Sequence, residues 1–190
     1  METVGEASAG GRAGWLEAGF DALAEGGVAN VRVEVLAKRL GVTKGGFYWH
    51  FRDRPELLSA LLADWRDGRI RTIDQQTSRL GGEPVATALR RLLDLYLGRG
   101  NPRGTAIELA VRDWARRQTE AADAVAAVDR HRLECVSRLF AQMNFAPEQA
   151  FARAYLFYAF IFGQSLLVCD RHAADMARTR ETCAQLLVGE

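Results

Sequence analysis

The sequence lacks an excess of charge of either sign. Its 25 lysines and arginines are almost balanced by 24 aspartates and glutamates, which leaves a formal net charge of +1 over 190 residues. A strongly basic chain would favour a polyanionic partner, whereas this balance neither favours nor excludes one. Any electrostatic attraction to such a partner must therefore arise from a local cluster of charges.

Long apolar runs are also missing. The most apolar stretch, YLFYAFIFGQSLLVC from Tyr155, is shorter than the roughly 20 residues that a membrane span requires, and it contains Gln164 and Ser165. We therefore expect a helix buried against protein and no association with a membrane. The opening residues, METVGEASAGGRAG, are acidic, small and glycine-rich, so we expect a flexible arm over residues 1–11 and no signal peptide.

Cysteine is scarce, and the three cysteines, Cys135, Cys169 and Cys183, are widely spaced. No Cys-x-x-Cys motif or Cys/His cluster has the spacing of metal ligands, so we predict no metal site and no cofactor. An odd number of cysteines without a secretion signal favours the reducing cytoplasm. Two interpretations stay open for these residues: small buried apolar side chains, or a thiol redox switch.

Catalytic constellations are missing as well. We find no Ser/His/Asp arrangement, no phosphate-binding loop and no pair of carboxylates on an apolar face. His131 and His172 stand among arginines and aspartates, which favours solvated side chains. The sequence therefore predicts a binding protein rather than an enzyme.

Apolar residues follow a helical spacing along the whole chain. Apolar residues recur three and four positions apart, alternating strand patterns do not occur, and glycine or proline marks the breaks. We therefore expect an all-α fold of about nine helices. The expected helices cover about residues 12–24, 33–40, 44–49, 54–79, 84–97, 105–118, 120–143, 147–168 and 172–187.

The strongest local signals lie in GVTKGGFYWHFRDRPELL, which starts at Gly41. Gly41 can take the left-handed conformation that ends a helix, with Val42 folding back over the last turn, and Thr43 can cap the next helix. Further on, Asp53 can cap the fourth helix, with Glu56 completing a capping box. Two helices joined by GVT form a helix-turn-helix, whose second helix enters the DNA major groove.

The second helix of this unit carries residues suited to that task. Gly45 and Gly46 inside a helix cost roughly 1 kcal/mol each against alanine, and close approach to another backbone is the usual reason for such glycines. Lys44 projects from the first turn, where the helix N-terminus also attracts phosphate. Tyr48 and His50 can donate hydrogen bonds to phosphate oxygens.

The surrounding residues add a small core and a basic edge. Phe47 and Phe51 are four positions apart, so they share a helix face and are expected to fill the core of the unit. Between Arg32 and Arg54 the six bases outnumber the two acids, which gives a local charge of +4. The bases are Arg32, Lys38, Arg39, Lys44, Arg52 and Arg54, and the acids are Glu34 and Asp53.

The segment VLAKRLGVTKGGFYWHFRDRPELLSALL resembles the DNA-binding domain of the tetracycline-repressor (TetR) family of transcriptional regulators. The shared pattern is Leu-Ala-x-x-Leu-Gly-Val-Ser/Thr, an aromatic pair, His-Phe, and a base followed by Glu-Leu-Leu, and the likeness covers about residues 12–66. Two positions depart from the pattern. Arg32 stands where Ser or Thr usually caps the second helix, and Arg54-Pro55 replaces a common Lys-acid pair.

The resemblance implies a DNA-binding domain over residues 12–66 and a helical regulatory and dimerisation domain over 67–190. It also implies that phosphates, bases or the DNA backbone are contacted by Arg32, Thr43, Lys44, Gly45, Gly46, Tyr48, Trp49, His50 and Arg54. Alternatives stay open for four of these residues. Thr43 can be a cap alone, His50 can pack on the fourth helix, Trp49 can be a simple apolar contact, and Arg54 can be a solvated base.

The helix expected at about 147–168 is apolar nearly all round, which predicts that several of its sides are covered. By the resemblance, this helix and the last one form a homodimer interface, and burial within one subunit is the alternative. The expected interface residues are Phe151, Tyr155, Tyr158, Phe162, Leu166 and Met176. Gly163 can permit close approach of helices across that interface.

The resemblance further implies a pocket for a small hydrophobic or amphipathic ligand. The candidate ligand contacts are Trp65, Tyr96, Arg112, Trp114, Phe140 and Phe157, although aromatic residues at helical spacing more often belong to a core. These features predict a cytoplasmic, ligand-responsive repressor that binds a palindromic operator in double-stranded DNA as a dimer. The alternative is a regulator of the same fold that answers a protein partner or cysteine oxidation.

Overall fold

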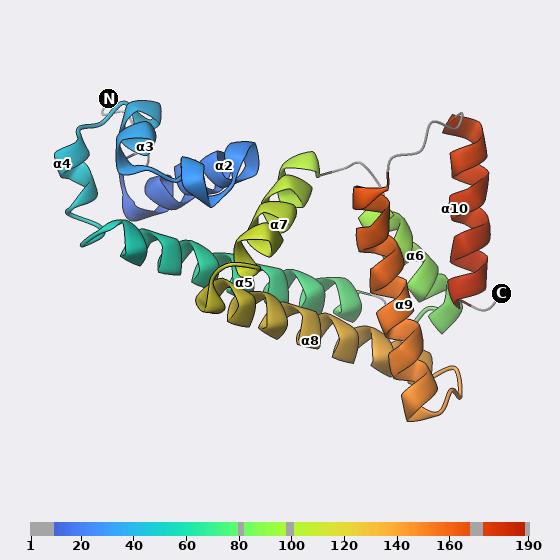
Figure 1. Cartoon of the computed structure of the whole chain (residues 1–190). Helices are drawn as coiled ribbons and strands as arrows, with labels where there is room; N and C mark the ends of the chain where they lie inside the picture. The colour runs from blue at the N-terminus through green and yellow to red at the C-terminus, as the bar shows by residue number, and fades with distance from the viewer. Residues whose placement is uncertain (1–9, 80–81, 98–100, 168–172, 189–190) are drawn as a thin grey trace, which may run out of the picture. The chain divides into compact units, whose positions relative to one another are not determined.

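The computed structural model describes residues 10–79, 82–97, 101–167 and 173–188, and this part of the chain is all helical (Figure 1). It contains nine α-helices, one short 3-10 helix and no strand, which confirms the expected fold class. The helices are α2 Arg12–Gly26, η1 Val28–Asn30, α3 Val33–Leu40, α4 Lys44–Phe47, α5 Arg54–Ser78, α6 Val85–Leu97, α7 Pro102–Ala115, α8 Thr119–Ala141, α9 Pro147–Leu166 and α10 Ala173–Val188. Within these residues no helix is both long and apolar enough to cross a bilayer.

The chain divides into two compact units. The first unit combines the residues up to Arg69 with Asn101–Val128, and the second combines Ile70–Gly100 with the residues from Asp129 onward. The helix α7 therefore belongs with the N-terminal helices: its Arg103 side chain pairs with Glu17 and Asp21 of α2, at 2.7 Å to each carboxylate. A functional boundary near residue 66 stays a prediction, because compactness alone does not define a functional domain.

The first helix packs along the face that the sequence predicted. Leu16, Phe20 and Leu23 are buried, and so is Trp15, which is fully inaccessible to solvent. The helix ends at Gly26, two residues beyond the expected end. The amide of Gly27 then donates to the Leu23 carbonyl at 2.8 Å in a left-handed conformation (φ 70°).

The turn between α3 and α4 has the geometry expected from GVT. Gly41 adopts φ 67° and ψ 23°, a left-handed conformation that a side chain would disfavour. The Val42 amide donates to the Ala37 carbonyl at 3.0 Å, and the Gly41 amide donates to the Lys38 carbonyl at 3.3 Å. These two bonds form the Schellman motif that satisfies the last carbonyls of α3 and fixes the direction of the chain into α4.

The start of α5 is capped by the predicted aspartate. The Asp53 carboxylate accepts a hydrogen bond from the Glu56 amide at 2.9 Å. The Glu56 carboxylate reaches back to the Arg52 amide at 2.8 Å, one residue earlier than in a standard capping box. Pro55 follows in the first turn, where its missing amide hydrogen is not needed.

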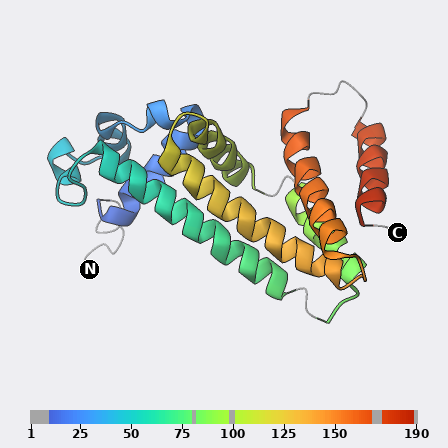
Figure 2. The same cartoon turned by 60° about the horizontal axis from the view of Figure 1, so that its bottom comes forward.

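The second unit has its own core, built from one face each of α6, α8, α9 and α10. A salt bridge between Arg90 of α6 and Glu181 of α10 ties two of these helices together. Within this unit the end of α5 and the second half of α8 lie side by side (Figure 2). The buried core residues are Ala88, Leu89, Leu92, Leu93, Val136, Phe140, Ala150, Ala154, Phe157, Tyr158, Ile161, Ala184 and Val188.

Candidate nucleic-acid interface

The helix α4 is a single turn, shorter than the six residues expected. It ends at Phe47 because the backbone tightens: the Tyr48 amide donates to the Gly45 carbonyl at 3.2 Å and the His50 amide to the Phe47 carbonyl at 2.9 Å. Such three-residue spacing is typical of helix ends. Thr43 occupies the predicted N-cap position with an extended backbone. Its hydroxyl makes no capping hydrogen bond to the helix, so the predicted side-chain cap is absent.

The aromatic residues of α4 and the turn after it divide into a buried pair and an exposed pair. Phe47 and Phe51 are buried and stack at 5.5 Å, and Trp15 of α2 meets Phe47 edge-on at 5.3 Å. Tyr48 and Trp49 are 58% and 88% exposed. The buried pair therefore anchors the short helix to the first unit, as predicted, while the exposed pair presents two large rings to solvent.

Among the described residues, none requires glycine at the start of α4. A Cβ atom added to Gly45 would lie 3.7 Å from the Thr43 hydroxyl, and one added to Gly46 would lie 4.0 Å from it, both ordinary contacts. Neither residue is among the described glycines with positive φ. Each nevertheless costs roughly 1 kcal/mol of helix propensity relative to alanine. Contacts among the described residues therefore do not explain why glycine occupies these two positions.

The basic edge is partly neutralised by acidic neighbours. Lys44 forms an ion pair with Glu34 of α3, which raises the pKa of the lysine and lowers that of the glutamate through their hydrogen bond. Arg39 pairs with Glu25 at 2.6 Å. Arg32, by contrast, is exposed and stands at the N-cap of α3 without a capping bond.

Arg54 has a role that neither sequence-based interpretation included. Its Nε donates to the Val31 carbonyl at 2.6 Å, and a terminal nitrogen donates to the Val28 carbonyl at 2.7 Å. Val28 opens η1, where its carbonyl also accepts from the Val31 amide at 3.2 Å, and Val31 follows η1. The guanidinium thus clamps the α2–α3 connection onto the start of α5, which a solvated base would not do.

Sequence reasoning also missed Arg12. Its guanidinium lies 5.1 Å from the centre of the Phe51 ring, which brings a positive charge from the start of α2 beside the end of the α4 turn. His50 is half-buried in that same turn. No local pattern links Arg12 to Phe51, because the two residues are brought together by the packing of α2 on the aromatic pair.

This helix-turn-helix matches a known family model, described as "Bacterial regulatory proteins, tetR family", over residues 16–61. Residues 16–61 therefore form a domain of the tetR family. In Pseudomonas putida, the HTH-type transcriptional regulator TtgR and the probable regulator ArpR are each 43% identical to it over 85 residues. The matched part covers 45% of this chain and 40% of each of those relatives, so the likeness in sequence is concentrated in part of the chain.

Solved structures extend the likeness in fold. A transcriptional regulator from Rhodococcus sp. Rha1 superimposes with a TM-score of 0.69 and 22% identity, covering 92% of both chains. Salmonella enterica GusR has a TM-score of 0.68 and 18% identity, covering 94% of this chain and 95% of its own. At such low identity these neighbours bear on the fold alone, and they match an N-terminal helix-turn-helix followed by a helical body.

The six predicted ligand contacts divide between the two units. Trp65, Arg112 and Trp114 lie in the first unit, and Tyr96, Phe140 and Phe157 lie in the second. Four of the aromatic residues, Trp65, Trp114, Phe140 and Phe157, are buried core positions. The hydroxyl of Tyr96 donates to Gln76 at 3.2 Å. Their role in ligand binding stays a prediction.

Arg112 is committed to a buried carboxylate of the first unit. Its Nε donates to one oxygen of Glu108 at 2.9 Å, while Arg69 donates to the other oxygen, also at 2.9 Å. Glu108 is only 3% exposed. The carboxylate therefore lies between two guanidinium groups and joins α5 to α7, a structural role that the sequence did not indicate.

The predicted interface residues fall into three groups. Phe151, Tyr155 and Leu166 are exposed on α9, as a subunit interface requires. Phe162 and Met176 are half-buried. Tyr158 is 6% exposed, because its ring packs into the core of its own subunit. Sequence reasoning missed the exposed leucines Leu167, just after α9, and Leu186 on α10. Cys169 and His172 lie outside the described residues.

Proposed function

We propose that this chain is a transcriptional regulator that binds double-stranded DNA through the helix-turn-helix of α3 and α4. One observation carries the proposal: Tyr48 and Trp49 are exposed beside Gly45 and Gly46, and no described residue would clash with a side chain at either glycine. In a free protein, large exposed rings and glycines inside a helix are both unfavourable. They become favourable when another surface, such as the floor of a major groove, approaches the backbone closely.

The roles of individual residues follow from their exposure and chemistry. Thr43 at the N-terminal end of α4 and Tyr48 and His50 just after its C-terminal end present hydroxyl or imidazole groups, which would donate to phosphate oxygens. Gly45 and Gly46 would admit the base edges, with Trp49 against an apolar group such as a thymine methyl. Arg32, exposed at the start of α3, would reach a flanking phosphate.

Lys44 would have to exchange partners on binding. In the free protein its ammonium group is held by Glu34, so a phosphate must displace a carboxylate. The carboxylate is then left close to the DNA backbone, which lowers the net gain from the lysine. A fully exposed pair of this kind contributes little to stability, so the exchange is feasible at moderate ionic strength.

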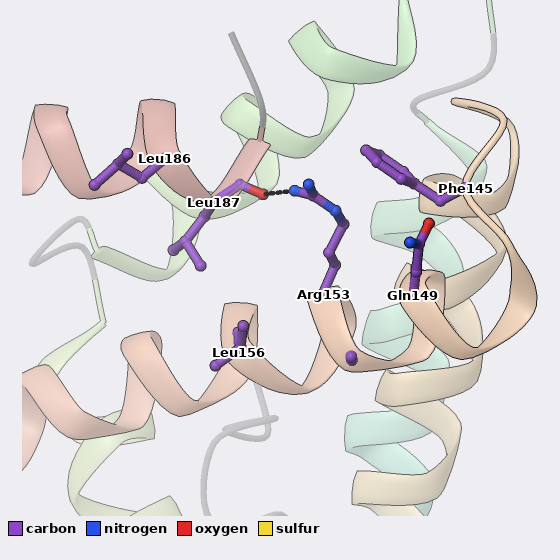
Figure 3. A pocket seen from close by; sticks show the side chains of 7 residues that line it. Phe145, Gln149, Arg153, Leu156, Leu186 and Leu187 are labelled. Carbon is purple, nitrogen blue, oxygen red and sulfur yellow. Dashed lines mark hydrogen bonds between the residues drawn. The ribbon is translucent and has the colours of Figure 1, made fainter.

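We propose that the regulator acts as a homodimer through α9 and α10. Support comes from the exposed apolar side chains of these two helices, Phe151, Tyr155, Leu156, Leu166 and Leu186, because large exposed apolar surface often marks an interface. A cleft of about 390 Å³ opens on this face, lined by Leu156, Leu186 and Leu187 and by Arg153, which donates to the Leu187 carbonyl at 3.3 Å (Figure 3). Apolar side chains of a second copy of the chain would fill such a cleft.

We further propose a small amphipathic ligand as the effector and repression as the mode of control. A second cleft of about 160 Å³ lies between α8 and α9, where the buried Arg132 faces the rings of Tyr158 and Phe162. Asp129 also lines the cleft and pairs with Arg132 at 3.2 Å, so the rings and this polar pair suit an aromatic compound that carries a polar group. Because coupling between two sites is reciprocal, operator DNA must weaken the binding of a releasing ligand by the same factor.

Selection of bound fragments from random double-stranded DNA would test the proposal. We expect a two-fold symmetric consensus whose half-sites lie roughly 34–36 Å apart, as two recognition helices in successive major grooves require. Trp49→Ala tests the assigned base contact: it should weaken the preference at the contacted base pair, and removal of a side chain that is 88% exposed leaves the core intact. Absence of any enriched sequence with the wild-type protein would refute DNA recognition, and an asymmetric consensus would refute the dimer.

A further inference from the structure

Three side chains with metal-binding chemistry meet in the second unit, among residues that the proposed function does not use. Asp74 comes from the end of α5, and His131 and Cys135 come from the second half of α8. The His131 Nε2 atom lies 2.7 Å from the Asp74 carboxylate and 3.8 Å from the Cys135 sulfur. All three ligand atoms lie within 4.8 Å of one another.

This arrangement differs from what the sequence predicted. The cysteines were expected to lack metal-ligand spacing, and His131 was expected to be solvated. His131 and Cys135 are in fact four positions apart, so both project from one face of α8. Asp74 is distant along the chain, and only the packing of α5 beside α8 brings its carboxylate to the pair.

We propose that Asp74, His131 and Cys135 bind one divalent metal ion of the zinc class, with water as the fourth ligand. Thiolate, imidazole and carboxylate are the three donor types that proteins use for zinc. With bonds of about 2.0–2.3 Å, tetrahedral ligand atoms stand about 3.3–3.6 Å apart. The observed 2.7 and 3.8 Å separations lie on either side of that range, so side-chain adjustments of less than about 1 Å would complete the geometry.

The charges around the cluster fit a divalent ion. Cys135 would lose its thiol proton to solvent on binding, so that thiolate and carboxylate together balance the charge of the metal. Cys135 is 4% exposed, and burial raises the pKa of its thiol, whereas Arg138 acts in the opposite direction. A terminal nitrogen of Arg138 donates to the sulfur at 3.1 Å, and this bond would stabilise the thiolate as an outer-shell contact.

The donor set also indicates which metals are excluded. Magnesium and calcium require oxygen ligands almost exclusively, so one carboxylate beside a thiol and an imidazole would hold them poorly. Zinc and cobalt accept this mixed set in tetrahedral geometry. The competing interpretation is an ordinary His131–Asp74 hydrogen bond with the cysteine packed beside it, and such a cluster would bind no ion.

Cobalt provides the decisive measurement, because a cobalt–thiolate bond gives a near-ultraviolet charge-transfer absorption. The tag-free full-length protein would be titrated with Co²⁺ under reducing conditions and then with Zn²⁺. We expect one Co²⁺ per chain, displaced by Zn²⁺, with the charge-transfer band lost in Cys135→Ser. Cys183→Ser is the matched control and should keep the band, since Cys183 lies on α10 and outside the cluster.

Two further variants test the other ligands. Asp74→Asn and His131→Gln preserve side-chain volume, and each should weaken Co²⁺ binding at least tenfold while circular dichroism reports an unchanged fold. The site would be overturned by absence of the band in the wild-type protein, or by a band that survives in Cys135→Ser. These results do not depend on DNA, so the metal site and the proposed function can fail separately.

Discussion

Replacement of Gly45 by alanine should stabilise the free protein and weaken its binding to operator DNA. The new Cβ would lie 3.7 Å from the Thr43 hydroxyl, which is an ordinary van der Waals contact, and the residue has no positive φ to strain. Alanine is favoured over glycine in a helix by up to about 1 kcal/mol. For a chain of this size that corresponds to an increase in Tm of roughly 2–4 °C.

The effect on DNA binding should have the opposite sign. If the groove floor approaches the backbone of α4 at Gly45, the added methyl group must push the helix outward and stretch the phosphate contacts beside it. A single misfit in a protein–DNA interface costs about 1–3 kcal/mol. We therefore expect Kd for the selected operator to rise about tenfold, which corresponds to about 1.4 kcal/mol.

Thermal unfolding and fluorescence anisotropy with a labelled operator measure the two effects separately. Gly41→Ala is the contrasting variant in the same turn: it also meets open space, but its φ of 67° makes alanine unfavourable, so Tm should fall. If Gly45→Ala raised Tm and left the operator Kd unchanged, close approach at this glycine would be refuted.

Four other predictions concern the same unit. Lys44→Ala should reduce the slope of log association constant against log salt by about 0.9, and Glu34→Gln should strengthen binding to any duplex a few-fold by freeing the lysine, both measured by salt titration. An unchanged slope in the first variant would remove Lys44 from the interface. Tyr48→Phe should weaken binding about tenfold on all sequences alike, because a phosphate contact carries no base information; a changed consensus after selection would contradict that role. Arg54→Met should lower the free energy of unfolding in urea by about 2–3 kcal/mol, because two backbone carbonyls lose a charged donor, and an unaffected midpoint would show that the clamp is dispensable.

Local signals in the sequence predicted most of the helix-turn-helix. Gly41 needs only its neighbours to end α3, Asp53 needs only the next turn to cap α5, and Phe47 and Phe51 share a face by spacing alone. Each of these features depends on residues within about one turn of helix, so a periodic reading of the chain captures them. The helix bounds of the described residues follow the expected ones closely for the same reason.

Features that depend on packing between helices were not predictable in this way. Arg54 binds carbonyls more than 20 residues away, and the Lys44–Glu34 pair joins two helices across a turn. Asp74 reaches His131 only because α5 and α8 lie side by side. The shortening of α4 reflects competition between three- and four-residue hydrogen bonds after a glycine pair, and sequence spacing does not report which one wins.

The placement of Glu108 between Arg69 and Arg112 has a consequence for how the protein tolerates sequence change. The trio carries a net positive charge, so loss of either arginine leaves a neutral pair, whereas loss of the carboxylate leaves two like charges against each other at a nearly dry position. The order in which these three residues can be replaced during evolution is therefore restricted. An arginine can disappear first and the glutamate afterwards, but a lineage that loses the glutamate first passes through a poorly folded ancestor.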